Sequence, residues 1–385
     1  MKILFAADVS FHYFSSFPGE DAAKTAMASA AARMAQADFS MINLENIFGD
    51  PSEGEPIVKS GPNLISSPDF MAYVRALSPT VVGLANNHTR DFGDVPMLQT
   101  MEMLREDGRI CVGAGRNIDE AYKSVILEKD GVRAAVFAVC ENEFGTASEN
   151  TGGTAGYSLA RVSHAIRDAR KNGCKPIIYF HGGTECSPFP SPGKVELYRH
   201  FIELGAEAVI AMHTHCPQGY EIYEGKPIVY SMGNFFFPLK NPPKRLSWQY
   251  GYMTELTLSE DGVSMELCPY RFTMDGIILL DGEEKASFEA YLACLKAPID
   301  DPAELCAWFD GWCLSSAYTH YLSNYRKELF ADGNTEKIKT LRNLFTCEAH
   351  NELLRNTMCM IYEGRVSAAE PYLARIQKLQ NMQTD

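Results

Sequence analysis

The chain has 385 residues, of which 46% are hydrophobic, and this length allows one large α/β domain or a core domain with an appendage. Its 49 acidic and 35 basic residues give a formal net charge of −14 and a pI of about 5.2. Because nucleic-acid binders usually carry a basic patch, we expect no nucleic-acid partner.

The N-terminal segment MKILFAADVS lacks the long apolar region and the small-residue cleavage site of a signal peptide. No stretch of the chain approaches 18 consecutive apolar residues, so we expect no membrane span. The eleven cysteines include no C-x-x-C pair, which argues against a zinc–thiolate site or a disulfide framework and favours reduced thiols. These features together predict a cytoplasmic protein.

Strand-length apolar runs recur along the first 240 residues, and helix-like segments separate several of them. Helical spacing is found at 22–37, 68–76, 96–107 and 194–204. Alternating strands and helices predict a layered α/β architecture. The strand-like runs are KILFAAD, FSMINLE, PTVVGLA, RAAVFAVC, KPIIYFHG, AEAVIAMH and KPIVYSMG.

The last third of the chain has a different character. Residues 252–273 alternate in polarity around the turn signal Asp261-Gly262, which predicts a β-hairpin. Beyond about residue 275 the sequence is mostly helix-like, and its histidines, His320 and His350, receive no chemical role. We therefore expect a first domain at 1–275 and a helical C-terminal appendage at 276–385. The helix-like segments cover 286–297, 302–325, 334–364 and 368–380.

Five strand-like runs end in side chains that can bind metal ions. Open α/β sheets place their ligands at such carboxyl ends. One such residue alone is more often a cap or a hydrogen-bonded group, but five separate strands with nitrogen or oxygen donors are hard to explain by coincidence. A donor set without thiolate suits one or two divalent cations such as Mn, Fe or Zn. The residues are Asp8, Glu45, Asn87 with His88, His181, and His213 with His215.

Two further acids, Glu141 and Glu143, follow the strand-like run that ends at Cys140. They face the same edge of the predicted sheet, where they could contact a substrate. A solvated loop is the favoured interpretation of this segment.

The order of these motifs resembles that of the calcineurin-like metallophosphoesterase superfamily. More narrowly, NLEN, LANNHTRDFG, HGGTE and HTHCPQGYEIYEGKPIVYSMGNF are similar to motifs of the CapA family, also called poly-γ-glutamate capsule biosynthesis proteins. The resemblance covers about residues 1–240. It implies a layered β-sandwich flanked by helices, followed here by the helical appendage.

The resemblance also implies two metal sites that share Glu45 as a bridge. Such a carboxylate can join two cations about 3.5–4 Å apart. Asp8 and His215 would complete the first site. The second site would contain Asn87, His181 and His213.

For the chemical step, the resemblance implies that His88 faces the substrate as a general acid or as a transition-state stabiliser. Asp91 would orient its imidazole and fix its tautomer. The implied reaction is metal-dependent hydrolysis of a phosphoester, or of an amide.

The sequence also departs from the superfamily pattern. Where the wider superfamily has Asp-x-His at the first strand, this chain has Ser10 in place of the histidine, and the nearest imidazole is His12. This departure weakens the first metal site. His12, Glu185 and Asn234 are candidates for supporting the ligands from outside. For Glu185 a ligand role and a simple loop position also stay open, and for Asn234 a structural turn contact does.

Two functions remain open at this point. The first is a hydrolase that acts on a small-molecule or polymer substrate in capsule or poly-γ-glutamate synthesis. The second is a non-catalytic polymer-binding or assembly factor with a vestigial metal site, which the missing histidine favours. A lesser possibility is that the appendage caps the site and selects the substrate. The sequence does not indicate the oligomeric state.

Overall fold

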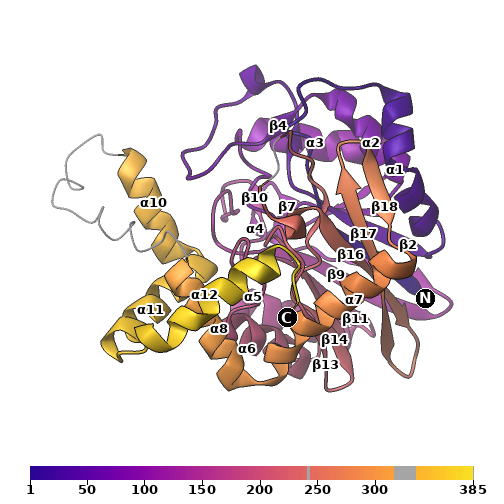
Figure 1. The fold of residues 1–385 in the computed structure, drawn as a ribbon. Coiled ribbons are helices and arrows are strands. Elements are labelled where there is room, and N and C mark those ends of the chain that lie inside the picture. The colour runs from indigo at the N-terminus through magenta and orange to yellow at the C-terminus, as the bar shows by residue number, and fades with distance from the viewer. Residues whose placement is uncertain (241–242, 316–334, 385) are drawn as a thin grey trace.

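Two mixed β-sheets lie face to face, with helices on their outer sides (Figure 1). The computed structural model describes residues 1–240, 243–315 and 335–384. The larger sheet has eight strands, and β15 (Asn234–Phe236) joins it by pairing with the end of β1. The other seven, in spatial order, are β18 (Gly276–Leu279), β17 (Val263–Thr273), β16 (Tyr250–Leu258), β1 (Lys2–Val9), β2 (Phe39–Leu44), β5 (Val81–Gly83) and β6 (Ile110–Val112).

The smaller sheet has six strands, and its central strands run parallel to one another. Two short strand pairs flank the sheets, β3 (Ile47–Phe48) with β4 (Ile65–Ser66) and β7 (Ala114–Gly115) with β10 (Gly153–Thr154). The six strands, in spatial order, are β13 (Tyr220–Tyr223), β14 (Lys226–Val229), β12 (Ala208–Met212), β11 (Lys175–His181), β9 (Val132–Cys140) and β8 (Val125–Lys129).

Helices cover both sheets. The first two pack together against the larger sheet, and α5 and α6 pack on the smaller one (Figure 1). None of the described helices combines the length and the apolar character needed to cross a bilayer. The helices up to the end of the smaller sheet are α1 (Glu20–Met34), α2 (Met71–Leu77), α3 (Asp94–Glu106), α4 (Ile118–Ala121), α5 (Leu159–Lys171) and α6 (Pro192–Glu203); short 3₁₀ turns cover Pro51–Glu53, Pro68–Phe70, Leu246–Trp248 and Ala297–Asp300.

The last four described helices gather at one side of the molecule, where they are drawn in orange and yellow in Figure 1, whereas the first helix of the C-terminal segment lies apart from them. One of them, α8, packs against both α6 and the last helix, so this segment is attached to the smaller sheet. The described helices of the segment are α7 (Gly282–Lys296), α8 (Pro302–Ser315), α10 (Thr335–Thr346), α11 (Glu348–Tyr362) and α12 (Val366–Gln380).

The main core lies between the two sheets. Residues 3–9 of β1 are fully buried because this strand is central in its sheet and covered on both faces. The hydroxyl of Tyr179 on β11 crosses the interface and donates a hydrogen bond to the carbonyl of Ala6. A Cβ at Gly83 would lie 2.9 Å from the Tyr179 ring, so β5 approaches closely only because it ends in glycine.

The predicted layered α/β fold with a helical C-terminal region is confirmed, and each of the seven strand-like runs contains a strand. The hairpin at 252–273 is formed by β16 and β17. The third strand β18 extends this sheet beyond residue 275, and the division into two domains there stays a prediction. The helix-like segment 334–364 breaks at Cys347, whose backbone is extended. Residues 316–325 of the segment 302–325, including His320, lie outside the described residues.

A buried ion-pair cluster fixes the start of β1 to α1 and β16. The Glu255 side chain is 2% exposed, and its carboxylate accepts hydrogen bonds from Lys2 at 2.8 Å and Arg33 at 2.9 Å. Burial by itself would raise the pKa of Glu255, but the positive charges of Lys2 and Arg33 hold it below its usual value. Its stabilisation is therefore present above the ordinary glutamate pKa of about 4.3 and is lost as the pH falls through the folded value.

We expect Glu255→Gln to lower the free energy of unfolding at pH 7 by about 2 kcal/mol, because it weakens two charge-assisted hydrogen bonds. Urea unfolding at pH 7 and at pH 3 measures the effect. The difference between variant and wild type should shrink at the lower pH. An equal difference at both pH values would contradict the ionic role of Glu255.

Candidate metal centre

The carboxyl ends of strands from both sheets meet at one buried point. In the larger sheet, Asp8 on β1 pairs with Asn43 on β2 and with Asn234 on β15. In the smaller sheet, His181 ends β11 and pairs with Met212, the last residue of β12. The parallel strands therefore present their terminal side chains to the same region. The six predicted ligands are all at least nine-tenths buried: Asp8, Glu45, Asn87, His181, His213 and His215.

These residues form two donor groups that share one carboxylate. Glu45 groups with His181 and His213, and it also groups with Asp8 and His215. Within each group the potential ligand atoms lie within 4.8 Å of one another. Glu45 Oε1 lies 3.7 Å from His181 Nε2 and 4.0 Å from His215 Nε2. This arrangement could hold one cation, or two cations that share the Glu45 carboxylate as a ligand.

The Glu45 carboxylate is the least satisfied group of the centre. Both of its oxygens are buried, and within the described part of the chain neither has a hydrogen-bond partner. Burial raises the pKa of Glu45 well above its usual value, and the nearby acids Asp8 and Glu185 raise it further. A buried carboxylate without a partner is costly in free energy, whereas a bound cation would satisfy it. The residues present therefore fit a divalent metal ion.

His181 Nε2 faces three other atoms that carry lone pairs. It lies 3.2 Å from Asn87 Oδ1 and 2.9 Å from His213 Nδ1, in addition to the Glu45 oxygen. On its other side, His181 Nδ1 lies 3.3 Å from Asp8 Oδ1. A proton on Nδ1, shared with the aspartate, would leave the lone pair of Nε2 directed toward the donor group. Four lone-pair atoms crowded together are a further reason to expect a cation there.

The other ligands are held by partners of their own. Burial alone would raise the pKa of Asp8, yet His181, His215 and a 2.7 Å hydrogen bond from Asn43 hold it below its usual value. Asn234 Oδ1 lies 2.8 Å from His215 Nδ1, and the other ring nitrogen of His215, Nε2, is on the side of Glu45. The supporting role of Asn234 stays a prediction.

The segment after β12 has an unusual backbone. His213 has φ of 102° and His215 has φ of 56°, in the left-handed region that non-glycine residues rarely adopt. The amide of His213 donates a 3.0 Å hydrogen bond to Asp8 Oδ2, which ties this turn to β1. Burial lowers the pKa of His213, and its neighbour His181 lowers it further, so the neutral form that binds metals is favoured. Such strain typically persists where the surrounding structure enforces it at a functional site.

His88 lies beside the donor groups with its imidazole held on one side. Its Nδ1 is 2.7 Å from Asp91 Oδ2, while its Nε2 is 3.9 Å from Glu45 Oε1. Lys59, which sequence reasoning missed, forms an ion pair with Asp91 and lies 2.9 Å from His88 Nδ1. Burial and the Lys59 charge lower the pKa of His88. Nothing in the sequence pointed to Lys59 beyond its place in the polar stretch KSGPN.

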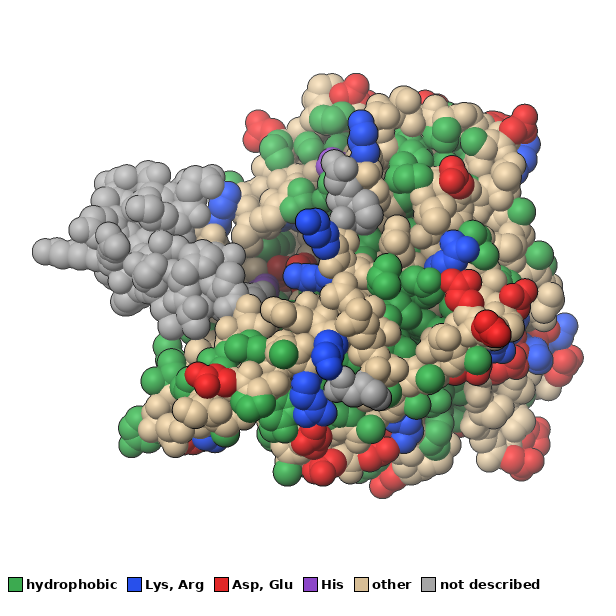
Figure 2. All heavy atoms as spheres, viewed as in Figure 1, with side chains coloured by type: hydrophobic (Ala, Val, Ile, Leu, Met, Phe, Trp, Pro, Cys, Tyr) green, Lys and Arg blue, Asp and Glu red, His purple; other side chains and the backbone are tan. Residues whose placement is uncertain are grey.

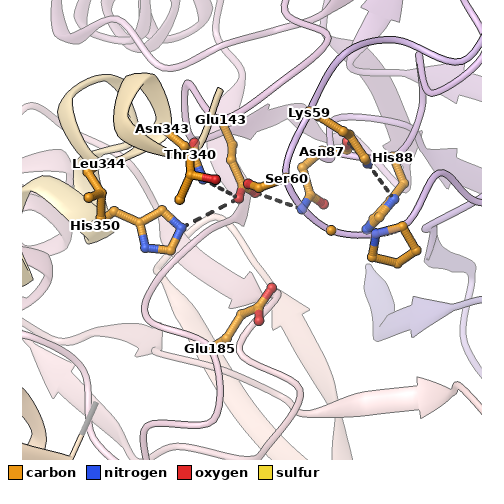
Figure 3. A pocket seen from close by; sticks show the side chains of 12 residues that line it. Lys59, Ser60, Asn87, His88, Glu143, Glu185, Thr340, Asn343, Leu344 and His350 are labelled. Carbon is orange, nitrogen blue, oxygen red and sulfur yellow. Dashed lines mark hydrogen bonds and ion pairs between the residues drawn. The ribbon is translucent and has the colours of Figure 1, made fainter. Parts of the chain in front are cut away.

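The remaining two candidates lie further out. His12 Nδ1 is 3.1 Å from the carbonyl of Ile65, its ring contacts Tyr13, and it belongs to neither donor group. Glu185 lines the adjoining pocket, where its carboxylate is turned toward the open space (Figure 3). It too is outside the donor groups.

A pocket of about 230 Å³ opens next to the centre. Figure 2 shows this face of the molecule hollowed, with charged and histidine side chains in and around the hollow. Helices α10 and α11 form part of its wall, so the C-terminal segment borders the candidate site. The lining residues, most of them labelled in Figure 3, are Lys59, Ser60, Gly61, Pro62, Asn87, His88, Glu143, Glu185, Thr340, Asn343, Leu344 and His350.

The structure corrects the expectation of a solvated loop at Glu141 and Glu143. Glu141 is buried in an ion pair with Lys194. Glu143 lies between the centre and the C-terminal helices, 3.5 Å from the His350 imidazole, which also lines the pocket. Burial by itself would raise the pKa of Glu143, but a hydrogen bond from His350 and the charge of His213 hold it below its usual range. Sequence reasoning missed His350 because its partner is distant in the chain.

The fold and the buried centre define a layered α/β protein with a candidate site for divalent cations. The chain belongs to the bacterial capsule synthesis protein family PGA_cap, whose model matches residues 2–239. The predicted CapA relationship is thereby confirmed. The described helices α7, α8, α10, α11 and α12 lie beyond the matched residues.

Several curated proteins are similar to this chain. It is 27% identical over 181 residues to the capsule biosynthesis protein CapA of Bacillus anthracis, covering 46% of this chain and 44% of the relative. It is 28% identical over 178 residues to the PGA biosynthesis protein CapA of Bacillus subtilis, covering 46% and 47%. A probable polyglutamine synthesis accessory protein of Mycobacterium tuberculosis is 26% identical over 219 residues, covering 51% and 55%. The chain thus spans about half the length of these relatives.

Two solved structures from Thermus thermophilus superimpose on part of this chain. A hypothetical protein of that organism gives a TM-score of 0.44 at 14% sequence identity, covering 73% of this chain and all of that one. A second protein, TT1561, gives a TM-score of 0.35 at 15% identity, covering 69% of this chain and 97% of that one.

Proposed function

We propose that this protein is a metal-dependent hydrolase that cleaves a phosphoester, or an amide, in the synthesis of capsule or poly-γ-glutamate. The observation that carries the proposal is the buried Glu45 carboxylate, which has no hydrogen-bond partner in the described chain and is shared by two donor groups. Membership of the capsule synthesis family and similarity to the CapA proteins of Bacillus support the connection to capsule and polyglutamate synthesis.

In this proposal, Asp8 and His215 would hold one divalent cation, a second would be held on the other side, and Glu45 would be available to both. Nitrogen and oxygen donors without thiolate suit Mn, Fe or Zn. When bound, such ions would polarise the scissile group and make a water molecule more acidic. The residues of the second side are Asn87, His181 and His213.

The chain's own proton donor in this proposal is His88. Its Nδ1 lies 2.7 Å from Asp91 Oδ2, and its Nε2 therefore faces the centre. The proton on Nε2 would pass to the leaving oxygen. Burial and Lys59 make the protonated imidazole a stronger acid. Lys59 also lines the pocket (Figure 3), where its ammonium group is paired with Asp91.

Metal removal tests the proposal. We expect the purified protein to contain Mn, Fe or Zn and to hydrolyse an aryl phosphate. Dialysis against EDTA should lower the rate to background, and added Mn²⁺ should restore it. Elemental analysis and release of the phenol measure the two properties. A protein with bound metal that cleaves neither phosphoesters nor γ-glutamyl amides would contradict the catalytic proposal.

The alternative is a non-catalytic assembly factor that retains the donor groups. It is favoured by the first strand, where Ser10 replaces an imidazole and its hydroxyl lies 3.4 Å from Asn46 Oδ1. His12 does not fill the gap, because it belongs to neither of the two donor groups. Retention of polyglutamate on the immobilised protein, without any turnover, would support this alternative.

A further inference from the structure

The first turns of α11 are fastened to the core beside the candidate centre. The Glu348 carboxylate accepts hydrogen bonds from the amide of Asn142 at 2.9 Å and from its side chain at 2.6 Å. One turn further along, the Glu352 carboxylate accepts a 2.8 Å hydrogen bond from the amide of Gly193 and another from the Ser191 hydroxyl at the start of α6. These contacts fix α11 on loops that follow β9 and β11.

The same helices reach Glu143, which joins them to a candidate metal ligand. Glu143 Oε2 accepts a 2.7 Å hydrogen bond from Asn87 Nδ2. Glu143 Oε1 accepts a 3.0 Å hydrogen bond from Asn343 Nδ2 on α10 and lies 3.5 Å from His350 Nε2 on α11. Figure 3 shows these contacts as a continuous chain from His350 and Asn343 through Glu143 to Asn87.

This chain of contacts decides which atom of the Asn87 amide faces the centre. Because Nδ2 is held by Glu143, the carbonyl oxygen Oδ1 is turned toward His181 Nε2, at 3.2 Å. Only the oxygen of an asparagine side chain can bind a metal ion, since the amide nitrogen has no free lone pair. The orientation of Glu143 therefore matters for a metal site to which it is not itself assigned.

We propose that Asn343 and His350 are positioning residues that act through Glu143 to hold Asn87 Oδ1 toward the metal centre. The inference rests on the proposed function for the assignment of Asn87 as a ligand. It adds that the C-terminal helices complete the centre, although they lie outside residues 2–239 that match the family.

Leucine and glutamine substitutions separate this role from simple packing. The test variants are Asn343→Leu and His350→Leu, singly and together, and His350→Gln restores an N–H donor at a similar reach. Arg342→Ala is the matched control, because Arg342 is exposed and adjacent to Asn343 on α10. Isothermal titration of the metal-free full chain with Mn²⁺ gives the affinity, and circular dichroism verifies the fold.

We expect the double variant to bind Mn²⁺ at least about tenfold more weakly, which is the usual effect of removing a group that orients a ligand. His350→Gln should bind more tightly than His350→Leu, and Arg342→Ala should match the wild type. If the double variant does not fold, Glu143→Gln is the deciding variant. The glutamine side chain has only one accepting oxygen, so it cannot accept hydrogen bonds from both Asn87 and Asn343 as the two carboxylate oxygens do. That variant should show the same weakening.

The outcomes distinguish this inference from the proposed function. Wild-type affinity in the folded double variant or in Glu143→Gln would overturn the inference and leave the hydrolase proposal intact. Equal weakening in Arg342→Ala would also overturn it, because the effect would then belong to the helix as a whole. Weakened Mn²⁺ binding in a protein without any hydrolytic activity would support the inference and contradict the hydrolase. A wild-type protein that binds no Mn²⁺ would overturn both.

Discussion

Glu45→Gln is expected to abolish tight Mn²⁺ binding while leaving the metal-free protein at least as stable as the wild type. The carboxylate forms no hydrogen bond within the described residues, so the substitution removes none. It does remove a buried group whose charge is disfavoured by burial and by Asp8. Because both donor groups share this residue, its loss would affect both candidate metal positions, and we expect hydrolysis to fall by at least about a thousandfold.

Thermal unfolding with EDTA and with Mn²⁺ separates the two effects. A cation present at about 100 times its dissociation constant would stabilise the wild type by about 2.7 kcal/mol, and this gain should be absent from Glu45→Gln. Glu255→Gln is the matched control, because that glutamate is also buried but is fully paired. The control should be destabilised and keep its metal. Mn²⁺-dependent stabilisation of Glu45→Gln would show that Glu45 is not a ligand.

The sequence predicted the strands and the candidate ligands at their ends because both signals are local. An apolar run followed by a polar residue, as at Asp8 and His181, is visible without knowledge of the fold. The parallel order of β1 with β2 and of β11 with β12 then brings those ends together. What could be predicted was therefore the set of candidate ligands and the sheet edge on which they meet.

The contacts that complete the pocket were not predictable in this way. Asn343 and Glu143 are 200 residues apart, and no local pattern connects them. No glycine or proline marks the break between α10 and α11 at Cys347. Glu348, which directly follows it, contacts Asn142. Closeness in sequence can also mislead: His12 is near Asp8 in the chain, but its imidazole contacts the carbonyl of Ile65. Tertiary packing decided each of these cases.

His88→Ala is expected to lower kcat by about 10²- to 10⁴-fold on a substrate with a poor leaving group, which is the range for the loss of a general acid. The effect should depend on the leaving group. Phenyl phosphate releases a phenol with a pKa of about 10, as for tyrosine, and needs a proton in the transition state. A nitro-substituted aryl phosphate releases a more acidic phenol and should be affected much less. Initial rates with both substrates, at saturating Mn²⁺, measure the difference.

The leaving-group dependence distinguishes a proton donor from a metal ligand. His88 Nε2 lies 3.9 Å from Glu45 Oε1, so loss of the imidazole could also disturb the centre. In that case the metal content would fall and both substrates would be slowed by the same factor. His164→Ala is the control, because that histidine is exposed on α5, away from the pocket that adjoins the centre. Retained metal together with a selective loss on phenyl phosphate would assign the proton to His88, since a structural defect cannot discriminate between leaving groups.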